Sequence, residues 1–165
     1  MGDYYDSSNN DQGLLLTESS GAWRTGVEAP LPANANTNPK VFLSSVSCAS
    51  PGNCTAVGSY INSSGKQQGL LLTENSGTWG AGVQAPLPAG ATTAGLAAVS
   101  CASAGNCSAV GDYTDSAGTL QGLLLSESSG AWGAGVKATL PAGSLNVEDI
   151  SSVSCVTSVQ SRPSA

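Results

Sequence analysis

The feature that most constrains this chain is an internal repeat with a period of about 53 residues, the shift from Cys48 to Cys101. The pattern Ser-Cys-Ala-x-x-Gly-Asn-Cys occurs at residues 47–54 and again at residues 100–107. Gly-Leu-Leu-Leu, followed by Thr or Ser and then Glu, occurs three times, and each copy ends in a tryptophan: Trp23, Trp79 and Trp132. A repeat of this length is one supersecondary unit that buries its apolar face against the next copy.

Each complete unit predicts four short strands, which we name A to D. In the third copy they are residues 96–101, 107–113, 121–126 and 132–138. Gly and Asn in the turn at residues 103–106 tolerate the positive φ of a tight hairpin. The chain holds 21 Gly and 8 Pro, and only 10% of its residues are charged, which favours short strands over helices.

The triple-leucine segments allow two interpretations, a helix nucleus or a buried strand. Glycine precedes each segment and Ser-Gly or Asn-Ser-Gly follows it, which leaves about five residues, too few for a helix that stands alone. We therefore expect strands that are buried on both faces.

The units are permuted along the chain. Residues 2–4 match the end of strand B at residues 111–113, and residues 153–155 match strand A. The chain is therefore expected to form a single repeat domain over residues 1–165. Its parts are a partial first unit with strands C and D (2–40), a second unit (41–93), a third unit (94–143), and a final strand A with a tail (144–165).

The charge pattern excludes several function classes. The net charge is −6, with five Lys and Arg and no His. Nucleic-acid binding needs a basic stripe, and binding to an anionic membrane surface needs a polybasic patch. No apolar run approaches the roughly 20 residues of a membrane span. Residues 1–6 lack the basic and apolar regions of a signal peptide, which leaves a cytosolic protein or part of an exported one.

The cysteines favour the exported alternative. Strands A and B would pair across a short turn and bring each Cys pair within disulfide distance, so we predict the bonds Cys48–Cys54 and Cys101–Cys107 and an extracellular or cell-surface location. A zinc site is the alternative, but zinc usually takes four Cys or His ligands, often in closer pairs. Cys155 lacks the expected partner, which predicts a free thiol, an intermolecular bond or an inert buried thiol.

The combined pattern resembles a known family. Ser-Cys-Ala-x-x-Gly-Asn-Cys-x-Ala-Val-Gly followed by Leu-Leu-Leu-x-Glu-x-Ser-Gly-x-Trp is similar to the β-propeller blade repeats of secreted bacterial proteins, and distantly to the sialidase-type Asp-box superfamily. This resemblance implies an all-β fold with three circularly permuted, four-stranded propeller blades. A β-trefoil, also built from three four-stranded repeats, is the alternative. Residues 73–79 are one residue shorter than an Asp box, and Ser19 and Ser128 stand where its Asp belongs.

Three blades cannot close a propeller, since about four is the usual minimum. The chain would then be a fragment of a longer array or a protomer that associates into a homo-oligomer. The final strand A, around residues 153–155, would complete the first blade of a neighbour, because an open strand edge is a template for pairing. Such association gives a ring of roughly six or nine blades if the rotation closes, and a filament if it does not.

No catalytic site is expected, and the chain is predicted not to be an enzyme. The absence of His rules out Ser-His-Asp and Cys-His arrangements. Sialidases, which the chain distantly resembles, hold their substrate with three Arg, and this chain has only Arg24 and Arg162. Glu18, Glu74 and Glu127 are equivalent by repeat, which favours a structural role over an acid–base pair. No phosphate-binding loop or other cofactor motif is present.

The recurrent aromatic residues are the candidate binding residues. They are Tyr4, Tyr60, Tyr113, Trp23, Trp79 and Trp132. Their rings would either stack on sugars or pack between blades, and the Tyr residues, beside polar loops, are the better candidates for binding. A weaker possibility is a calcium site among the loop aspartates, for which a solvated polar loop is the favoured explanation: Asp3, Asp6, Asp11, Asp112 and Asp115.

These observations predict a non-catalytic extracellular repeat module without a cofactor, which binds carbohydrate in the manner of a lectin through its polar loops and aromatic rings. The alternative is a structural protein that assembles itself into a ring or filament by strand complementation between chains.

Overall fold

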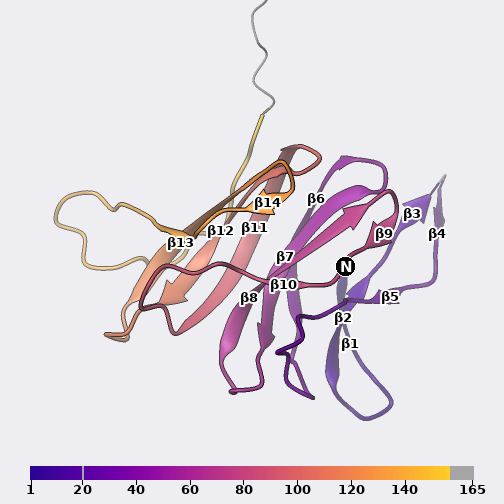
Figure 1. Cartoon of the computed structure of the whole chain (residues 1–165), viewed down its shortest axis with the longest axis horizontal. Helices are drawn as coiled ribbons and strands as arrows, with labels where there is room; N and C mark the ends of the chain where they lie inside the picture. The colour runs from indigo at the N-terminus through magenta and orange to yellow at the C-terminus, as the bar shows by residue number, and fades with distance from the viewer. Residues whose placement is uncertain (20, 157–165) are drawn as a thin grey trace, which may run out of the picture.

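All regular secondary structure is β-strand in the computed structural model, which describes residues 1–19 and 21–156. The described residues form no helix, and so none that is long and apolar enough to cross a membrane. The strands form three successive antiparallel sheets, one for each predicted unit (Figure 1). The all-β prediction is confirmed.

The first sheet has the order β1-β2-β5, and β3 and β4 form a separate two-stranded hairpin between β2 and β5 in the chain. Its strands are β1 (Gly2–Tyr5), β2 (Asp11–Leu15), β3 (Glu18–Ser19), β4 (Ala22–Trp23) and β5 (Val27–Glu28). The second sheet has the order β10-β8-β7-β6, with β9 paired to β8. Its strands are β6 (Phe42–Ser50), β7 (Asn53–Ile61), β8 (Gln67–Asn75), β9 (Thr78–Trp79) and β10 (Val83–Gln84).

The third sheet repeats the second, with the order β11-β12-β13 and with β14 and β15 both paired to β13. Its strands are β11 (Thr93–Ser103), β12 (Asn106–Thr114), β13 (Leu120–Ser128), β14 (Ala131–Trp132) and β15 (Val136–Lys137). Strand A thus corresponds to β6 and β11, and strand B to β7 and β12. In the first sheet strand B is represented by β1, and no strand A lies beside it in the described structure.

The prediction of one continuous strand D is wrong, because strand D is split in two. Trp132 pairs with Glu127 and Val136 pairs with Leu124. Four positions along strand D thus face three positions along β13. The extra residue cannot join the ladder, and pairing breaks between β14 and β15 as it does at a β-bulge.

The two predicted disulfides are confirmed. Cys48 lies opposite Cys54 in the β6–β7 register, and Cys101 lies opposite Cys107 between β11 and β12. Both pairs are bonded, with Cα atoms 3.9 and 4.0 Å apart. Cys155 is half-buried and has no sulfur partner among the residues that the structure describes.

The core lies between the sheets, which pack face to face. Leu70 and Leu72 of β8 point toward the first sheet, whereas Leu71 points toward the third, and all three are at most 1% exposed. The triple-leucine segment of β8 is therefore a strand buried on both faces, as predicted, whereas those at the end of β2 and in β13 each expose one face, at Leu16 and Leu124. Strand β11 lies against β6, β7 and β8, and the backbone N–H of Cys101 donates to Oγ of Ser47 at 3.0 Å across this interface.

The predicted final strand A is not a strand. Residues 138–156 have no assigned strand, and residues 157–165 of the predicted tail lie outside the described residues. The backbone N–H of Cys155 nevertheless donates to Oγ of Ser100 at 2.9 Å, as that of Cys101 does to Ser47. The segment occupies the place of a strand A, but no strand B lies beside it among the described residues, and so it forms no ladder there.

Candidate functional site

Two of the tyrosines predicted to bind ligand are buried. Tyr60 is 0% exposed and Tyr113 is 4% exposed. The hydroxyl of Tyr60 donates to Oδ1 of Asn34 at 2.8 Å, and the ring of Tyr113 lies in the core between the second and third sheets. These rings have no free face for a sugar, because the adjacent sheet and loops cover the end of strand B.

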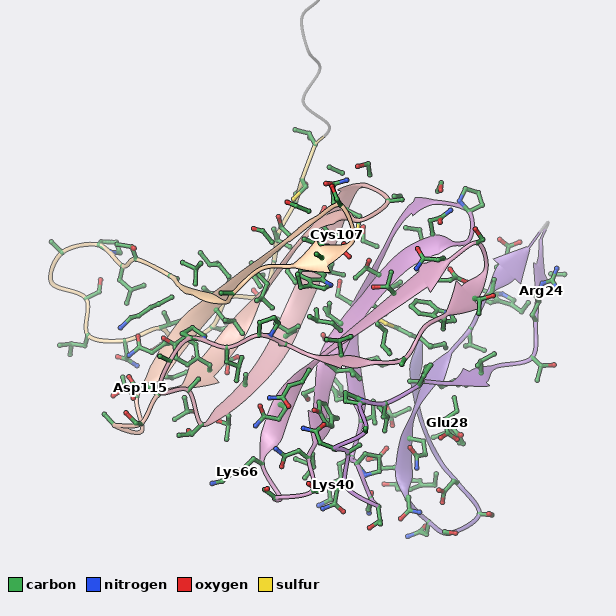
Figure 2. All side chains as sticks on the ribbon, in the orientation of Figure 1. Arg24, Glu28, Lys40, Lys66, Cys107 and Asp115 are labelled. Carbon is green, nitrogen blue, oxygen red and sulfur yellow. A yellow bond between two sulfur atoms is a disulfide. The ribbon has the colours of Figure 1, made fainter. Side chains whose placement is uncertain are left out.

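Tyr4 is half-buried, and its hydroxyl is already engaged. It donates a hydrogen bond of 2.8 Å to Oε2 of Glu28, a residue labelled on the first sheet in Figure 2. This hydrogen bond, together with nearby negative charge, raises the pKa of Tyr4 above its usual value. The hydroxyl of Tyr4 is therefore used in a hydrogen bond within the first sheet.

The three tryptophans are equivalent by repeat but lie in different environments. Each one pairs with a glutamate across the C–D turn. Trp79 packs on the core between the first and second sheets, and Trp132 packs on the core between the second and third. Trp23 is 71% exposed, because the described residues place no sheet on that side of the first sheet.

The glutamates that pair with these tryptophans differ in exposure in the same way. Glu74 and Glu127 are 4% exposed, and burial raises the pKa of both carboxyl groups. Oε2 of Glu127 has no hydrogen-bond partner in the described part of the chain. Glu18 is exposed and accepts a hydrogen bond from the backbone N–H of Gly21. The exposure and the pKa of this glutamate thus depend on whether another sheet covers its copy of the repeat.

A cleft opens between the first and second sheets. It has a volume of about 420 Å³, and its lining includes the ring of Trp79, Glu74 and Arg24. A recess of about 200 Å³ also involves Trp79 and Glu74 and reaches Val46 and Cys48. Figure 2 labels Arg24 at the edge of the first sheet. The cleft combines an aromatic face, a carboxylate and a guanidinium.

The corresponding space between the second and third sheets holds only about 10 Å³. There the β6–β7 hairpin of the second sheet contributes Asn53 and Thr55 to the lining. The first sheet has no such hairpin in the described structure. Val46 is therefore 45% exposed at the first boundary, whereas its equivalent Val99 is 6% exposed at the second.

Two of the loop aspartates, Asp6 and Asp115, accept hydrogen bonds from the backbone of their own loops and so stabilise turns. Oδ1 of Asp115 accepts hydrogen bonds from the backbone N–H groups of Thr119 and Ala117, and Asp6 makes the same contacts in the first sheet. These bonds lower the pKa of both carboxyl groups. Figure 2 shows Asp115 on the loop between β12 and β13.

Asp3, Asp11 and Asp112 do not extend these turns into a metal site. No group of three or more His, Cys, Asp or Glu residues suitable for a metal occurs among residues 1–19 and 21–156. Burial, and then the charge of Asp149, raises the pKa of Asp112. Asp112 therefore lies close to the segment that follows the third sheet.

Sequence reasoning missed the two outer faces of the stack. Leu16 is 42% exposed, whereas its equivalent Leu72 is 0% exposed. Leu124 is 37% exposed, whereas its equivalent Leu71 is 1% exposed. We call Leu16 and Trp23 the first outer face, and Leu124 the second. The repeat pattern alone could have located both faces, since in the described structure the first and third copies each have a neighbouring copy on one side only.

No family model and no curated protein matches this sequence.

Proposed function

We propose that the chain is a non-catalytic extracellular structural module that assembles by stacking copies of itself through its two outer faces. The observation that carries this proposal is that repeat-equivalent residues are buried inside the stack and exposed at its ends. Leu71 and Leu72 are buried at the boundaries between sheets. Their equivalents Leu124 and Leu16 are exposed on the outer faces. The two outer faces are therefore complementary, because the same residues already pack against each other twice within the chain.

We further propose that the sheets are β-propeller blades. One sheet per repeat, packed face to face with the next, supports this arrangement over a β-trefoil, in which strands of different repeats pair in a barrel. With three sheets in each copy, closed stacking gives roughly six or nine blades, and open stacking gives a filament. The two disulfides support an extracellular or cell-surface location.

Sedimentation velocity over about 1–300 µM chain is expected to give a mass that rises above 16.2 kDa with concentration. Leu16→Ser removes apolar area from the first outer face and is expected to weaken association at least about tenfold. Val83→Ser is the matched control, since Val83 is 52% exposed but lies on the edge strand β10. A monomer at every concentration, or equal effects of the two substitutions, would contradict the proposal.

A second candidate function is carbohydrate binding, which the cleft between the first and second sheets favours. Trp79 offers a ring face, and Glu74 and Arg24 offer polar groups that can orient hydroxyls. A glycan array should identify a bound sugar. Trp79→Ala should then weaken that binding more than tenfold, whereas Trp23→Ala, which lies outside the lining of the cleft, should not. An array without hits removes this candidate.

A further inference from the structure

We propose that the outer edge of β1, which pairs with no strand in the described structure, accepts residues 150–155 of a second copy as strand A. The end of one chain would thereby complete the first sheet of the next. This inference rests on the proposed stacking function and specifies how copies are held in register.

No strand pairs with the outer edge of β1 among the residues that the structure describes, and this edge is shaped for a strand. In the second sheet, a Cβ added to Gly58 would collide with the carbonyl oxygen of Phe42 and lie 2.9 Å from Cα of Leu43. Glycine is therefore required at this position because the backbone of strand A approaches strand B too closely for a side chain. Gly111 meets β11 in the same way in the third sheet.

Gly2 is the matching glycine of the first sheet. It pairs with Leu14, as Gly58 pairs with Leu70. A Cβ added to Gly2 would meet nothing within 4 Å. The first sheet therefore has the glycine that admits a strand A, with open space where that strand would lie. The N–H and C=O groups on the outer edge of β1 have no strand partner in the described part of the chain, and they are a template for such a strand.

Residues 150–155 are the counterpart of this edge, because they take the place of a strand A that has no strand B beside it in the described structure. They lie on the third sheet where the strand A of a following sheet would lie, as the hydrogen bond from Cys155 to Ser100 indicates. The side chain of Ile150 lies over Gly122, as Leu96 lies over Gly69 at the preceding boundary. The segment is held in place by the third sheet, but no strand B lies beside it in the described structure.

The repeat fixes the expected register. Leu96 lies opposite Gly111 in the third sheet, so its equivalent Ile150 is expected opposite Gly2 of the second copy. The next pair places Asp149 opposite Asp3. Like charges directly opposite each other weaken a strand pair, and salt screens this repulsion. Association by this route is therefore expected to strengthen when salt is raised.

The docked strand would also join the two outer faces. The third sheet of one copy would carry residues 150–155 and Leu124 to the first sheet of the next, where Leu16 and Trp23 are exposed. Strand pairing and apolar burial would thus occur at one junction, as they do at the boundary between the second and third sheets.

The test compares two neighbouring substitutions in the whole chain by sedimentation velocity. Gly2→Val is expected to weaken association more than about thirtyfold, because its Cβ would occupy the space of the incoming backbone. Its thermal midpoint should remain that of the unaltered chain, since nothing lies within 4 Å of that Cβ in the single copy. Asp3→Asn, one residue away, should instead strengthen association about two- to fivefold by removing one of the opposed charges.

A cross-linking experiment checks the register directly. Asp3→Cys and Asp149→Cys are combined with Cys155→Ser, and oxidised glutathione serves as the oxidant. The chain should then form disulfide-linked multiples of 16.2 kDa, because opposite positions in a strand pair lie within disulfide distance. Tyr5→Cys combined with Asp149→Cys in the same background is the out-of-register control and should remain uncross-linked.

The outcomes separate the inference from the function on which it rests. If the unaltered chain stays monomeric, both proposals are overturned. If it associates but Gly2→Val associates equally and the in-register cysteines do not cross-link, the strand inference is wrong and stacking through the outer faces stands.

Discussion

Gly58→Ala is expected to destabilise the chain by at least about 3 kcal/mol, one of the two largest effects anticipated for a single substitution. The added Cβ would collide with the carbonyl oxygen of Phe42, and only movement of the β6 backbone would relieve this contact. That backbone is held by its ladder with β7 and by the Cys48–Cys54 disulfide at the far end of the hairpin. A flexible side chain could turn away from such a contact, but a paired strand cannot.

Urea unfolding of the two proteins at about 1 µM measures this difference. Gly2→Ala is the matched control, because the same change at the equivalent position of β1 meets no atom within 4 Å. Its free energy of unfolding should stay within about 0.5 kcal/mol of the unaltered chain. Equal losses for the two substitutions would refute the close approach of strand A to strand B.

The sequence pattern predicted most of the strands, because residues that make the same packing contacts recur in each copy of the repeat. The Leu-Leu-Leu segment, the turn glycines and the Cys pairs are constrained in every copy by contacts within one unit or with the next. The split of strand D was not predictable in this way. It depends on a count of residues between two pairs, Trp132 with Glu127 and Val136 with Leu124, and that count appears only once the register is known.

The candidate site was harder to predict for a related reason. Tyr60 and Tyr113 follow strand B beside polar loops, which suggested exposed rings, but the neighbouring sheet and loops bury them. Trp23, Trp79 and Trp132 each follow a Ser-Gly pair and precede a Gly-Val pair, yet their exposure is unequal. Local sequence determines which face a residue occupies, whereas its position in the stack determines whether that face is covered.

The same reasoning links the two candidate functions. The recess beside the cleft is open where the first sheet has no strand A, and it exposes Val46 of β6. The equivalent Val99 is covered at the next boundary, where both strands A are present. A docked segment 150–155 would lie against Val46 and close the recess. A sugar that extends from the cleft into this recess and a second copy on β1 would therefore compete for this region of the chain.

Leu71→Ala is expected to cost about 3–5 kcal/mol in the same unfolding experiment, whereas Leu124→Ala should cost much less at about 1 µM. Leu71 is 1% exposed between the second and third sheets, so its removal leaves a cavity that two packed sheets cannot collapse around. Leu124 occupies the equivalent position of β13 and is 37% exposed, so water fills most of the space that its side chain vacates.

The concentration dependence then distinguishes an outer face from an ordinary exposed leucine. If Leu124 is buried by a second copy, the loss caused by Leu124→Ala should grow toward that of Leu71→Ala as the chain concentration rises and association becomes populated. The loss caused by Leu71→Ala, which is buried within one copy, should change little. A difference between the two leucines that stays constant from about 1 to 300 µM would place Leu124 outside any contact between copies.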